Sequence, residues 1–133
     1  GNYIFGLPDD SIARMQETLD MALDLNCEFA NFYSAMAYPG SQLFDMSQAE
    51  GIALPRTWKD FSQHGYEALP LANKHCSAAD ILEFRDNAFT AYFTDRRYLD
   101  MVRQKFGADV VDHIGRMVDI PLKRKLLEDK KAA

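Results

Sequence analysis

The sequence predicts an α/β chain in which two short strand–helix units are followed by a mainly helical segment. Three observations favour this fold class. Two short apolar runs near the N-terminus flank an amphipathic helical pattern, a long irregular stretch follows over 52–76, and helical periodicity then continues toward the C-terminus. We therefore divide the sequence into an α/β part, residues 1–51, and a looped and helical extension, residues 52–133.

The α/β part is expected to alternate strand and helix. The run Asn-Tyr-Ile-Phe-Gly-Leu at 2–7 predicts a strand, and a polar cap followed by apolar residues at 3.6-residue spacing predicts a helix over 10–25. The nearly continuous apolar run over 28–37 is typical of a strand covered on both faces. A short helix over 42–50 should follow, with Gly51 as its left-handed cap.

The spacing of the two strands predicts a parallel pair that is incomplete. The strands begin about 26 residues apart, which suits a parallel crossover unit. Two parallel strands do not readily form a sheet that is stable alone. We therefore expect neighbouring strands to come from outside these residues.

The extension is expected to form a loop and then several helices. In the loop, Trp58, Phe61 and Tyr66 should hold the chain against the surface. Ser77 and Asp80 have the spacing of a capping box, and later helices are predicted over 95–106 and 108–119. Pro121 should end the last of these, with Leu122, Leu126 and Leu127 continuing into a charged tail. Core packing is expected for the aromatic residues Phe84, Phe89, Tyr92, Phe93 and Tyr98.

Charge and composition argue against several classes of function. The formal net charge of −5 disfavours nucleic-acid binding, and no apolar run has the ~20 residues of a membrane span. The two cysteines, Cys27 and Cys76, lack the spacing of a redox or metal motif, and with no secretory leader in the sequence this favours a cytoplasmic location. We expect a solvated helix tail for the basic residues Lys123, Arg124, Lys125, Lys130 and Lys131.

The first ten residues carry a motif. They read Gly-Asn-Tyr-Ile-Phe-Gly-Leu-Pro-Asp-Asp, which resembles the fifth-strand motif of radical S-adenosylmethionine (SAM) barrels, usually Gly-x-Ile-x-Gly-x-x-Glu. Ile4 and Gly6 match this motif. Asn2 stands in place of the first glycine and Asp9 in place of the glutamate.

A second string resembles the sixth strand of the same family. It extends over 32–44 and contains the turn Tyr38-Pro39-Gly40-Ser41 before a short helix. Farther on, the residues around Trp58 and over 62–71 are similar to the segment after the barrel in the cobalamin-dependent branch. That branch includes relatives of the anaerobic magnesium-protoporphyrin IX monomethyl ester cyclase.

The resemblance implies the last two strand–helix units of a partial (βα)6 barrel within a larger oxidoreductase or transferase. Such an enzyme cleaves SAM reductively to a 5′-deoxyadenosyl radical that acts on a small-molecule substrate. Its four-iron four-sulfur cluster is held by a Cys-x-x-x-Cys-x-x-Cys loop, which this sequence lacks. Cobalamin would belong to an N-terminal domain. The isolated piece is therefore expected to bind none of these three cofactors alone and to be inactive.

The same resemblance places SAM-binding residues at the strand ends. An apolar side chain at Ile4 would cover the adenine, and Gly6 would let the backbone approach the ligand. The other interpretation makes Ile4 a core residue and Gly6 a turn residue. A second stretch, either bordering the ligand or packed beneath the helices, consists of Met36, Ala37 and Tyr38.

Other polar residues have simpler interpretations. His64 is a candidate substrate-facing group in the parent enzyme, or else a loop histidine with an internal partner. Asp9 and Asp10 suit helix capping better than acid–base catalysis, because adjacent side chains rarely converge. No metal-ligand spacing connects His75, Cys76 and His113, and no residue of the chain is predicted to be catalytic.

A competing hypothesis is a non-catalytic helical module that docks a protein partner. An apolar barrel seam left open by missing strands would favour such docking. Unpaired strand edges also lead us to expect self-association of the isolated chain.

Overall fold

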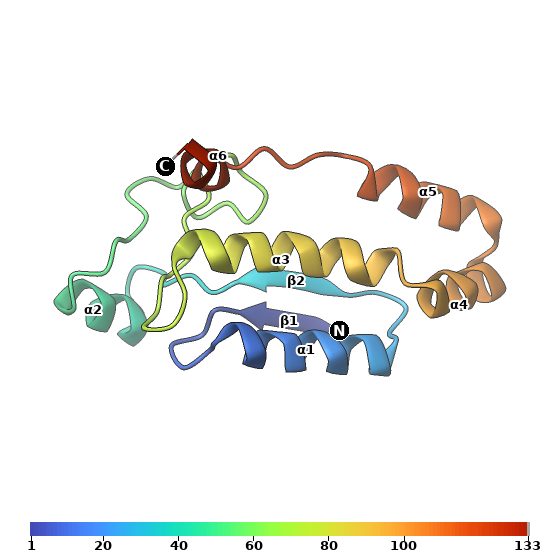
Figure 1. The fold of residues 1–133 in the computed structure, drawn as a ribbon, viewed down its shortest axis with the longest axis horizontal. Helices are drawn as coiled ribbons and strands as arrows, with labels where there is room; N and C mark the ends of the chain where they lie inside the picture. The colour runs from blue at the N-terminus through green and yellow to red at the C-terminus, as the bar shows by residue number, and fades with distance from the viewer. Residues whose placement is uncertain (133) are drawn as a thin grey trace.

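The protein is a small α/β domain. A computed structural model describes residues 1–132, which contain six helices and a two-stranded parallel sheet (Figure 1). The elements are β1 (Asn2–Phe5), α1 (Ile12–Leu25), β2 (Asn31–Ser34), α2 (Gln42–Ala49), α3 (Ala78–Phe93), α4 (Arg96–Phe106), α5 (Ala108–Val118) and α6 (Lys125–Ala132).

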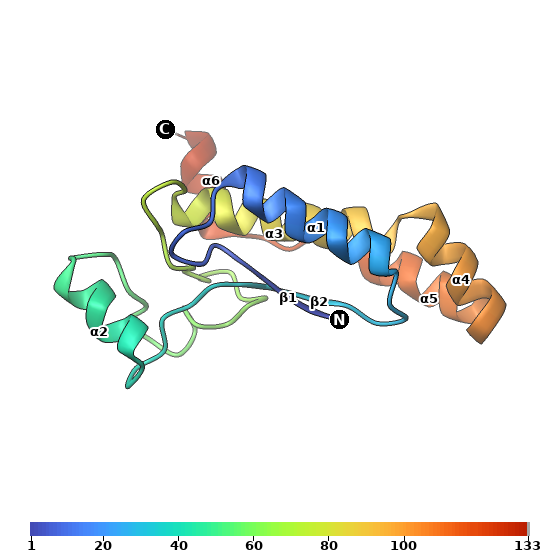
Figure 2. The same cartoon turned by 90° about the horizontal axis from the view of Figure 1, so that it is seen from below.

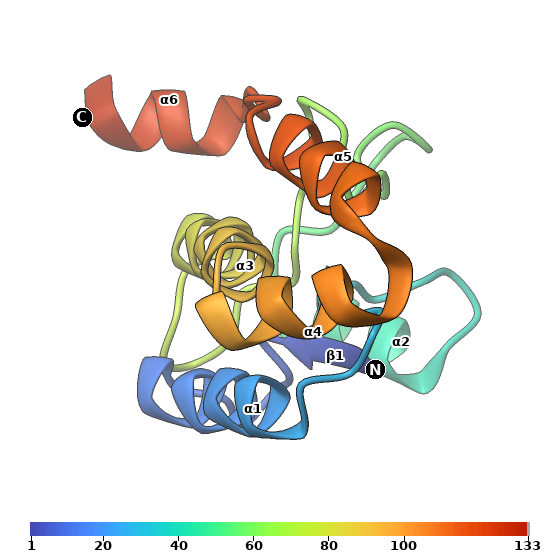
Figure 3. The ribbon, with the colours of Figure 1, turned by 90° about the vertical axis from the view of Figure 1, so that its right-hand side faces the viewer.

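Helices α1 and α3 cover the same face of the sheet, as Figure 2 shows most clearly. The strands pair in parallel, with Tyr3 opposite Phe32 and Phe5 opposite Ser34. The side chains of Tyr3, Phe5 and Phe32 are buried beneath the helices. Helices α4 and α5 pack at one end of α3, and α6 lies at its other end (Figures 1 and 3).

The local signals in the sequence explain where the helices begin and end. Ser11 caps α1 by accepting a hydrogen bond from the amide of Arg14, and Asn26 ends that helix in the left-handed conformation. Ser77 and Asp80 form the predicted capping box of α3. The predicted α4 and α5 are separated by Gly107, and α5 ends before Pro121.

Two apolar clusters meet on α3. The larger joins both strands to α1, α3, α4 and α5. Of the aromatic residues expected in the core, it contains Tyr92, Phe93 and Tyr98, while Phe84 and Phe89 are partly buried against it. Among these rings, Tyr92 contacts Phe93 and Tyr98 at centroid distances of 5.3 and 4.9 Å. The smaller cluster joins Met36 to Leu82 and to Ala68 of the irregular segment. The helix α3 therefore fixes both the sheet and the loop that follows it.

The second strand is shorter than the apolar run predicted. Only Asn31–Ser34 forms β2, instead of 28–37, because β1 turns away at Gly6, where φ is +85°. The last main-chain bond between the two segments runs from the amide of Ala35 to the carbonyl of Phe5, at 2.7 Å. Residues beyond Ala35 have no strand opposite them.

The sheet is also covered on one face rather than two. The side chains of Ile4 and Tyr33 point away from the helices, and Ile4 is 47% exposed. The apolar character of the second run arises partly from residues after the strand, where Met36 and Ala37 are buried in the chain's own core.

The irregular segment is held down by fewer aromatic residues than expected. Phe61 stacks on Tyr38 with ring centroids 5.3 Å apart. The hydroxyl of Tyr66 donates a 2.7 Å hydrogen bond to the Glu128 carboxylate. Trp58, however, is 82% exposed, so the prediction that it anchors the loop is wrong. Anchoring comes instead from hydrogen bonds made by Gln63 and by the backbone near Leu71.

Candidate functional site

The predicted SAM-binding residues lie at the same end of the sheet. Parallel strands place their carboxyl ends together, so Ile4 and Gly6 of the first strand are near the segment that follows the second. In that segment Met36 and Ala37 are buried, whereas Tyr38 is 50% exposed. Side-chain contact with a ligand is therefore open to Ile4 and Tyr38, whereas Gly6, Met36 and Ala37 are buried within the chain.

Contacts within the chain itself explain why position 6 is a glycine. A Cβ atom at Gly6 would lie 2.6 Å from the Ile81 side chain, and the positive φ further disfavours any other residue. The Gly6 amide donates a 3.0 Å hydrogen bond to the Asp10 carboxylate, which also accepts from the Leu7 amide at 2.9 Å. Asp10 thus organises the β1–α1 turn, while Asp9 forms an ion pair with Lys74.

The outer edge of β2 is closed by side chains. In a parallel ladder the main-chain N–H and C=O groups of alternate residues point to opposite edges of a strand. Those of Phe32 and Ser34 therefore point away from β1. The side-chain amide of Gln63 bonds both the amide and the carbonyl of Ser34, each at 3.0 Å. The Arg85 Nε donates to the Phe32 carbonyl at 2.8 Å. This edge therefore has no room for another strand.

The outer edge of β1 is different. The same alternation points the main-chain groups of Asn2 and Ile4 away from β2. Within residues 1–132, these groups make no hydrogen bond on that edge. The sheet thus has one closed edge and one open edge, and a further strand would be accepted only beside β1.

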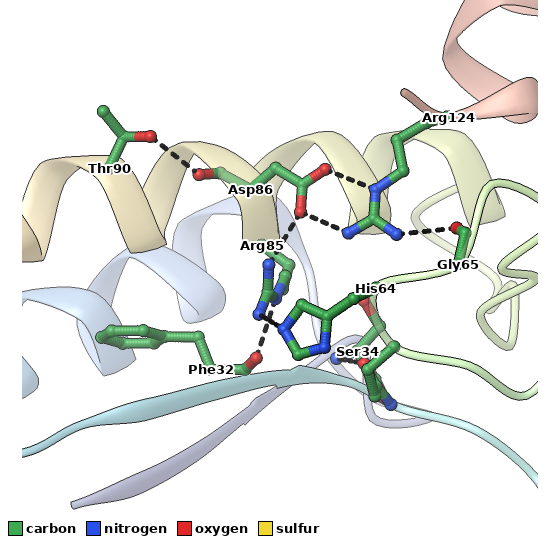
Figure 4. A network of polar contacts seen from close by, with 9 residues as sticks. Phe32, Ser34, His64, Gly65, Arg85, Asp86, Thr90 and Arg124 are labelled. Atoms are coloured by element: carbon green, nitrogen blue, oxygen red, sulfur yellow. Dashed lines mark hydrogen bonds and ion pairs between the residues drawn. The ribbon is translucent and has the colours of Figure 1, made fainter. Parts of the chain in front are cut away.

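A buried ion-pair network joins α3 to the segment before α6 (Figure 4). Arg124 bonds both carboxylate oxygens of Asp86 at 2.9 Å and donates to the Gly65 carbonyl at 2.9 Å. Arg85 donates to the same carboxylate at 2.9 Å. The side chains of Arg85 and Arg124 are 3% and 0% exposed. The prediction that Arg124 belongs to a solvated helix tail is therefore wrong.

His64 belongs to this network rather than to the open face of the sheet. Its Nε2 lies 3.0 Å from an Arg85 terminal nitrogen, as Figure 4 shows. Because a guanidinium only donates, Nε2 must accept and the neutral ring carries its proton on Nδ1. Partial burial, followed by the charges of Arg85 and Arg124, lowers the pKa of His64. The structure does not bring His64 together with Ile4.

A cavity of about 420 Å³ opens beside this network. His64, Arg85, Asp86 and Thr90 form its polar side. Its remaining walls come from α3, α5 and the following turn, namely Phe89, Met117, Val118, Ile120, Pro121 and Leu122. This combination of apolar walls and a few converging polar groups is typical of small-molecule sites.

A larger hollow of about 800 Å³ lies between α2, the loop after it and α6. One of its three carboxylates, Asp60, accepts hydrogen bonds at Oδ2 from the amides of Arg56 and Thr57, each at 2.9 Å. These backbone bonds lower the pKa of Asp60. Neither of the two buried guanidinium groups lines this hollow, so the smaller cavity is the stronger candidate for ligand binding.

No pattern in the sequence predicts the Arg85–Asp86–Arg124 network. Arg85 and Asp86 sit in a regular amphipathic helix, and Arg124 sits in a run of basic residues. The one available signal is a charged residue at an apolar helical position, since Arg85 follows Ile81 by four residues.

The structure also bears on metals and membranes. Within residues 1–132, no three or more His, Cys, Asp or Glu side chains gather closely enough to hold a metal ion. Cys27 is half-buried and Cys76 is buried, and both are free thiols. In the same described part of the chain, no helix has the length and apolar character that crossing a membrane requires.

Comparison with known proteins gives one partial similarity to report. An uncharacterized methyltransferase of Pyrococcus horikoshii is 29% identical over 62 residues, which are 47% of this chain and 14% of that protein. The matched segment is thus a small part of a much longer relative. No family model and no solved structure matches the chain.

Proposed function

We propose that residues 1–51 form the last two strand–helix units of a radical SAM barrel within a longer enzyme. The asymmetry of the sheet carries this proposal. Gln63 and Arg85 close the outer edge of β2, as suits a final strand, while β1 keeps an open edge for a preceding one. The partial similarity to a much longer methyltransferase supports an enzymatic parent that transfers a group.

The open face of the sheet suits an adenine ring. Ile4 presents a half-exposed apolar side chain there, next to Tyr33 of the paired strand. In the proposed enzyme Ile4 excludes water from one face of the ring, and the backbone over 36–38 borders it. SAM with a reduced four-iron four-sulfur cluster supplies radical chemistry when both are bound.

The chain itself does not fit the cluster. Cys27 ends up against Tyr3 and Tyr92, whereas Cys76 is buried before α3, where burial raises the pKa of its thiol. Two separate thiols of this kind cannot replace the three-cysteine loop. The cluster ligands, and any cobalamin site, therefore belong to the preceding part of the enzyme, which acts on a small molecule in the cytoplasm.

The test uses the full-length product of the gene. After anaerobic reconstitution with iron and sulfide, reduction in the presence of SAM should release 5′-deoxyadenosine. We expect Ile4→Asp to lower its formation at least tenfold, because a carboxylate would face the adenine. Met21→Asp is the matched control, since Met21 is 51% exposed on α1 and far from the strand ends.

Two results would overturn the proposal. One is the absence of a Cys-x-x-x-Cys-x-x-Cys loop upstream of Gly1, and the other is no 5′-deoxyadenosine from a well-reconstituted protein. The second candidate function, a helical module that binds a protein partner, would then be favoured. The exposed side chains of Phe29 and Trp58, 65% and 82% accessible, support that alternative.

A further inference from the structure

The ion-pair network that borders the cavity beside α3 has an excess of buried positive charge. Arg85 and Arg124 share the single carboxylate of Asp86. Tyr33 lies near enough to act on Arg85 as well, but a tyrosine is neutral at ordinary pH. Two cations and one anion leave a net charge of +1.

His64 does not change this sum near neutral pH, because its ring accepts a hydrogen bond from Arg85 and so remains uncharged. A buried guanidinium without its own counter-ion is costly, since its attraction to an anion is the main compensation for lost hydration. Carbonyl groups of Phe32 and Gly65 offset part of this cost. A further anion in the cavity would offset the remainder.

Arg85 also has hydrogen-bonding capacity to spare. A guanidinium carries five N–H groups. Within the described residues, Nε donates to the Phe32 carbonyl, one terminal nitrogen donates to Asp86, and the other donates to His64. One N–H therefore remains on each terminal nitrogen, which is the number that a carboxylate accepts when it binds in a bidentate manner.

We infer that this cavity binds a small monocarboxylate with an apolar body, its carboxylate held by Arg85 next to His64. The body would lie against Phe89 and the turn that contains Ile120 and Leu122. The volume of about 420 Å³ is within the roughly 300–1,000 Å³ range of small-molecule sites. This inference does not depend on radical chemistry. The cavity lies on the helical side of the sheet, whereas the proposed SAM contact is on the open face.

The charge balance selects a carboxylate over other head groups. A single negative charge neutralises the excess of +1, whereas a doubly charged phosphate would leave a buried negative charge. An amine would add to the positive charge. A neutral alcohol would fill the apolar walls but leave the guanidinium without its anion.

The first experiment titrates the 133-residue chain with octanoate, octanol and octylamine, using calorimetry at neutral pH. We expect octanoate to bind at least tenfold more tightly than octanol, with no detectable binding of octylamine. Equal affinities for octanoate and octanol would overturn the inference. Because no cluster or SAM is needed, this outcome is separate from that of the 5′-deoxyadenosine test.

Two variants and one control locate the binding site. Ile120→Asp puts a carboxylate at the rim, where Ile120 is 65% exposed, and should weaken octanoate binding at least tenfold without disturbing the fold. Met21→Asp, on the opposite side of the molecule, should leave it unchanged. Arg85→Met should abolish the preference for octanoate over octanol. If Arg85→Met does not fold, Ile120→Asp alone tests the position of the site. Unchanged octanoate affinity in Ile120→Asp would overturn the inference.

His64 provides a readout that non-specific binding would not change. A carboxylate beside its ring favours the imidazolium, so octanoate should raise the pKa of His64 while octanol should not. The measurement is a pH titration of the imidazole signals by NMR with and without each ligand. An unaltered His64 titration in saturating octanoate would show that the carboxylate binds elsewhere.

Discussion

Arg124 combines full burial with a permanent charge, which makes its contacts essential to the fold. Its guanidinium has no exposed surface and forms a two-point contact with Asp86. Without Arg124, the Asp86 carboxylate would keep its bond from Arg85 but would lose two hydrogen bonds inside the protein. Arg124 also bonds the Gly65 carbonyl, so it connects the loop, α3 and the segment before α6.

We expect Arg124→Ala to lower the free energy of unfolding by about 3 kcal/mol, because its hydrogen bonds to Asp86 and Gly65 and the packing of a large buried side chain are lost together. Lys123→Ala is the matched control, because the neighbouring lysine is exposed and its loss should change stability by less than about 0.5 kcal/mol. Urea unfolding followed by circular dichroism measures both. Equal effects of the two substitutions would contradict the structural role of Arg124.

The sequence was least informative about the contacts of single residues. Lys123, Arg124 and Lys125 are equivalent in a charge pattern, and the partner that distinguishes Arg124 lies 38 positions away in the chain. Gly6 was identified from its motif, but the side chain that requires a glycine there, Ile81, belongs to a distant helix. Non-local contacts of this kind cannot be read from a local pattern.

Among the elements, the start of α3 is tied to α6 by charge. Asp80 accepts from the Ser77 amide at 3.0 Å and from Lys130 at 2.8 Å. Lys130 also donates to Glu83 at 2.8 Å. The hydrogen bond from Lys130, followed by that from Ser77, lowers the pKa of Asp80 from 3.8 to about 2. The capping box and the last helix therefore support each other.

This coupling predicts a defined pH dependence of stability. The folded-state pKa of Asp80 is below its unfolded value, so the unfolded chain binds the proton first on acidification. The stabilisation should be complete above about pH 4 to 5 and should be lost as the pH falls toward 2. Asp80→Asn should lack this component. Unfolding free energies of both proteins between pH 2 and 6 provide the test, and parallel curves would contradict it.

Helix boundaries were well predicted because caps are local. Ser77, Asp80 and Asn26 act within one turn of the residues that they stabilise, so their spacing in the sequence is sufficient evidence. The end of β2 was predicted wrongly, because it depends on where β1 turns away at Gly6. The number of covered faces depends on the whole arrangement of helices and could not be inferred from the apolar run.

For the molecule as a whole, the unequal edges of the sheet determine how it meets other chains. The main-chain groups of Asn2 and Ile4 face outward on β1, whereas those of Tyr3 and Phe5 face β2. Next to the open edge, Ile4 is 47% exposed. An unprotected edge beside an apolar side chain is a template for pairing with a second copy.

We expect the isolated chain to self-associate through β1, and Ile4→Lys to shift sedimentation toward the monomer because charged side chains repel each other at a shared edge. Met21→Lys, on the outer face of α1, should not have this effect.

In the monomeric variant the amide at position 4 should exchange with solvent faster than those of Tyr3 and Phe5, which bond to β2. A preceding strand in the full-length protein should slow exchange at position 4. Slow exchange there in a monomeric chain would mean that the edge is already closed, which would remove the main support for a missing strand.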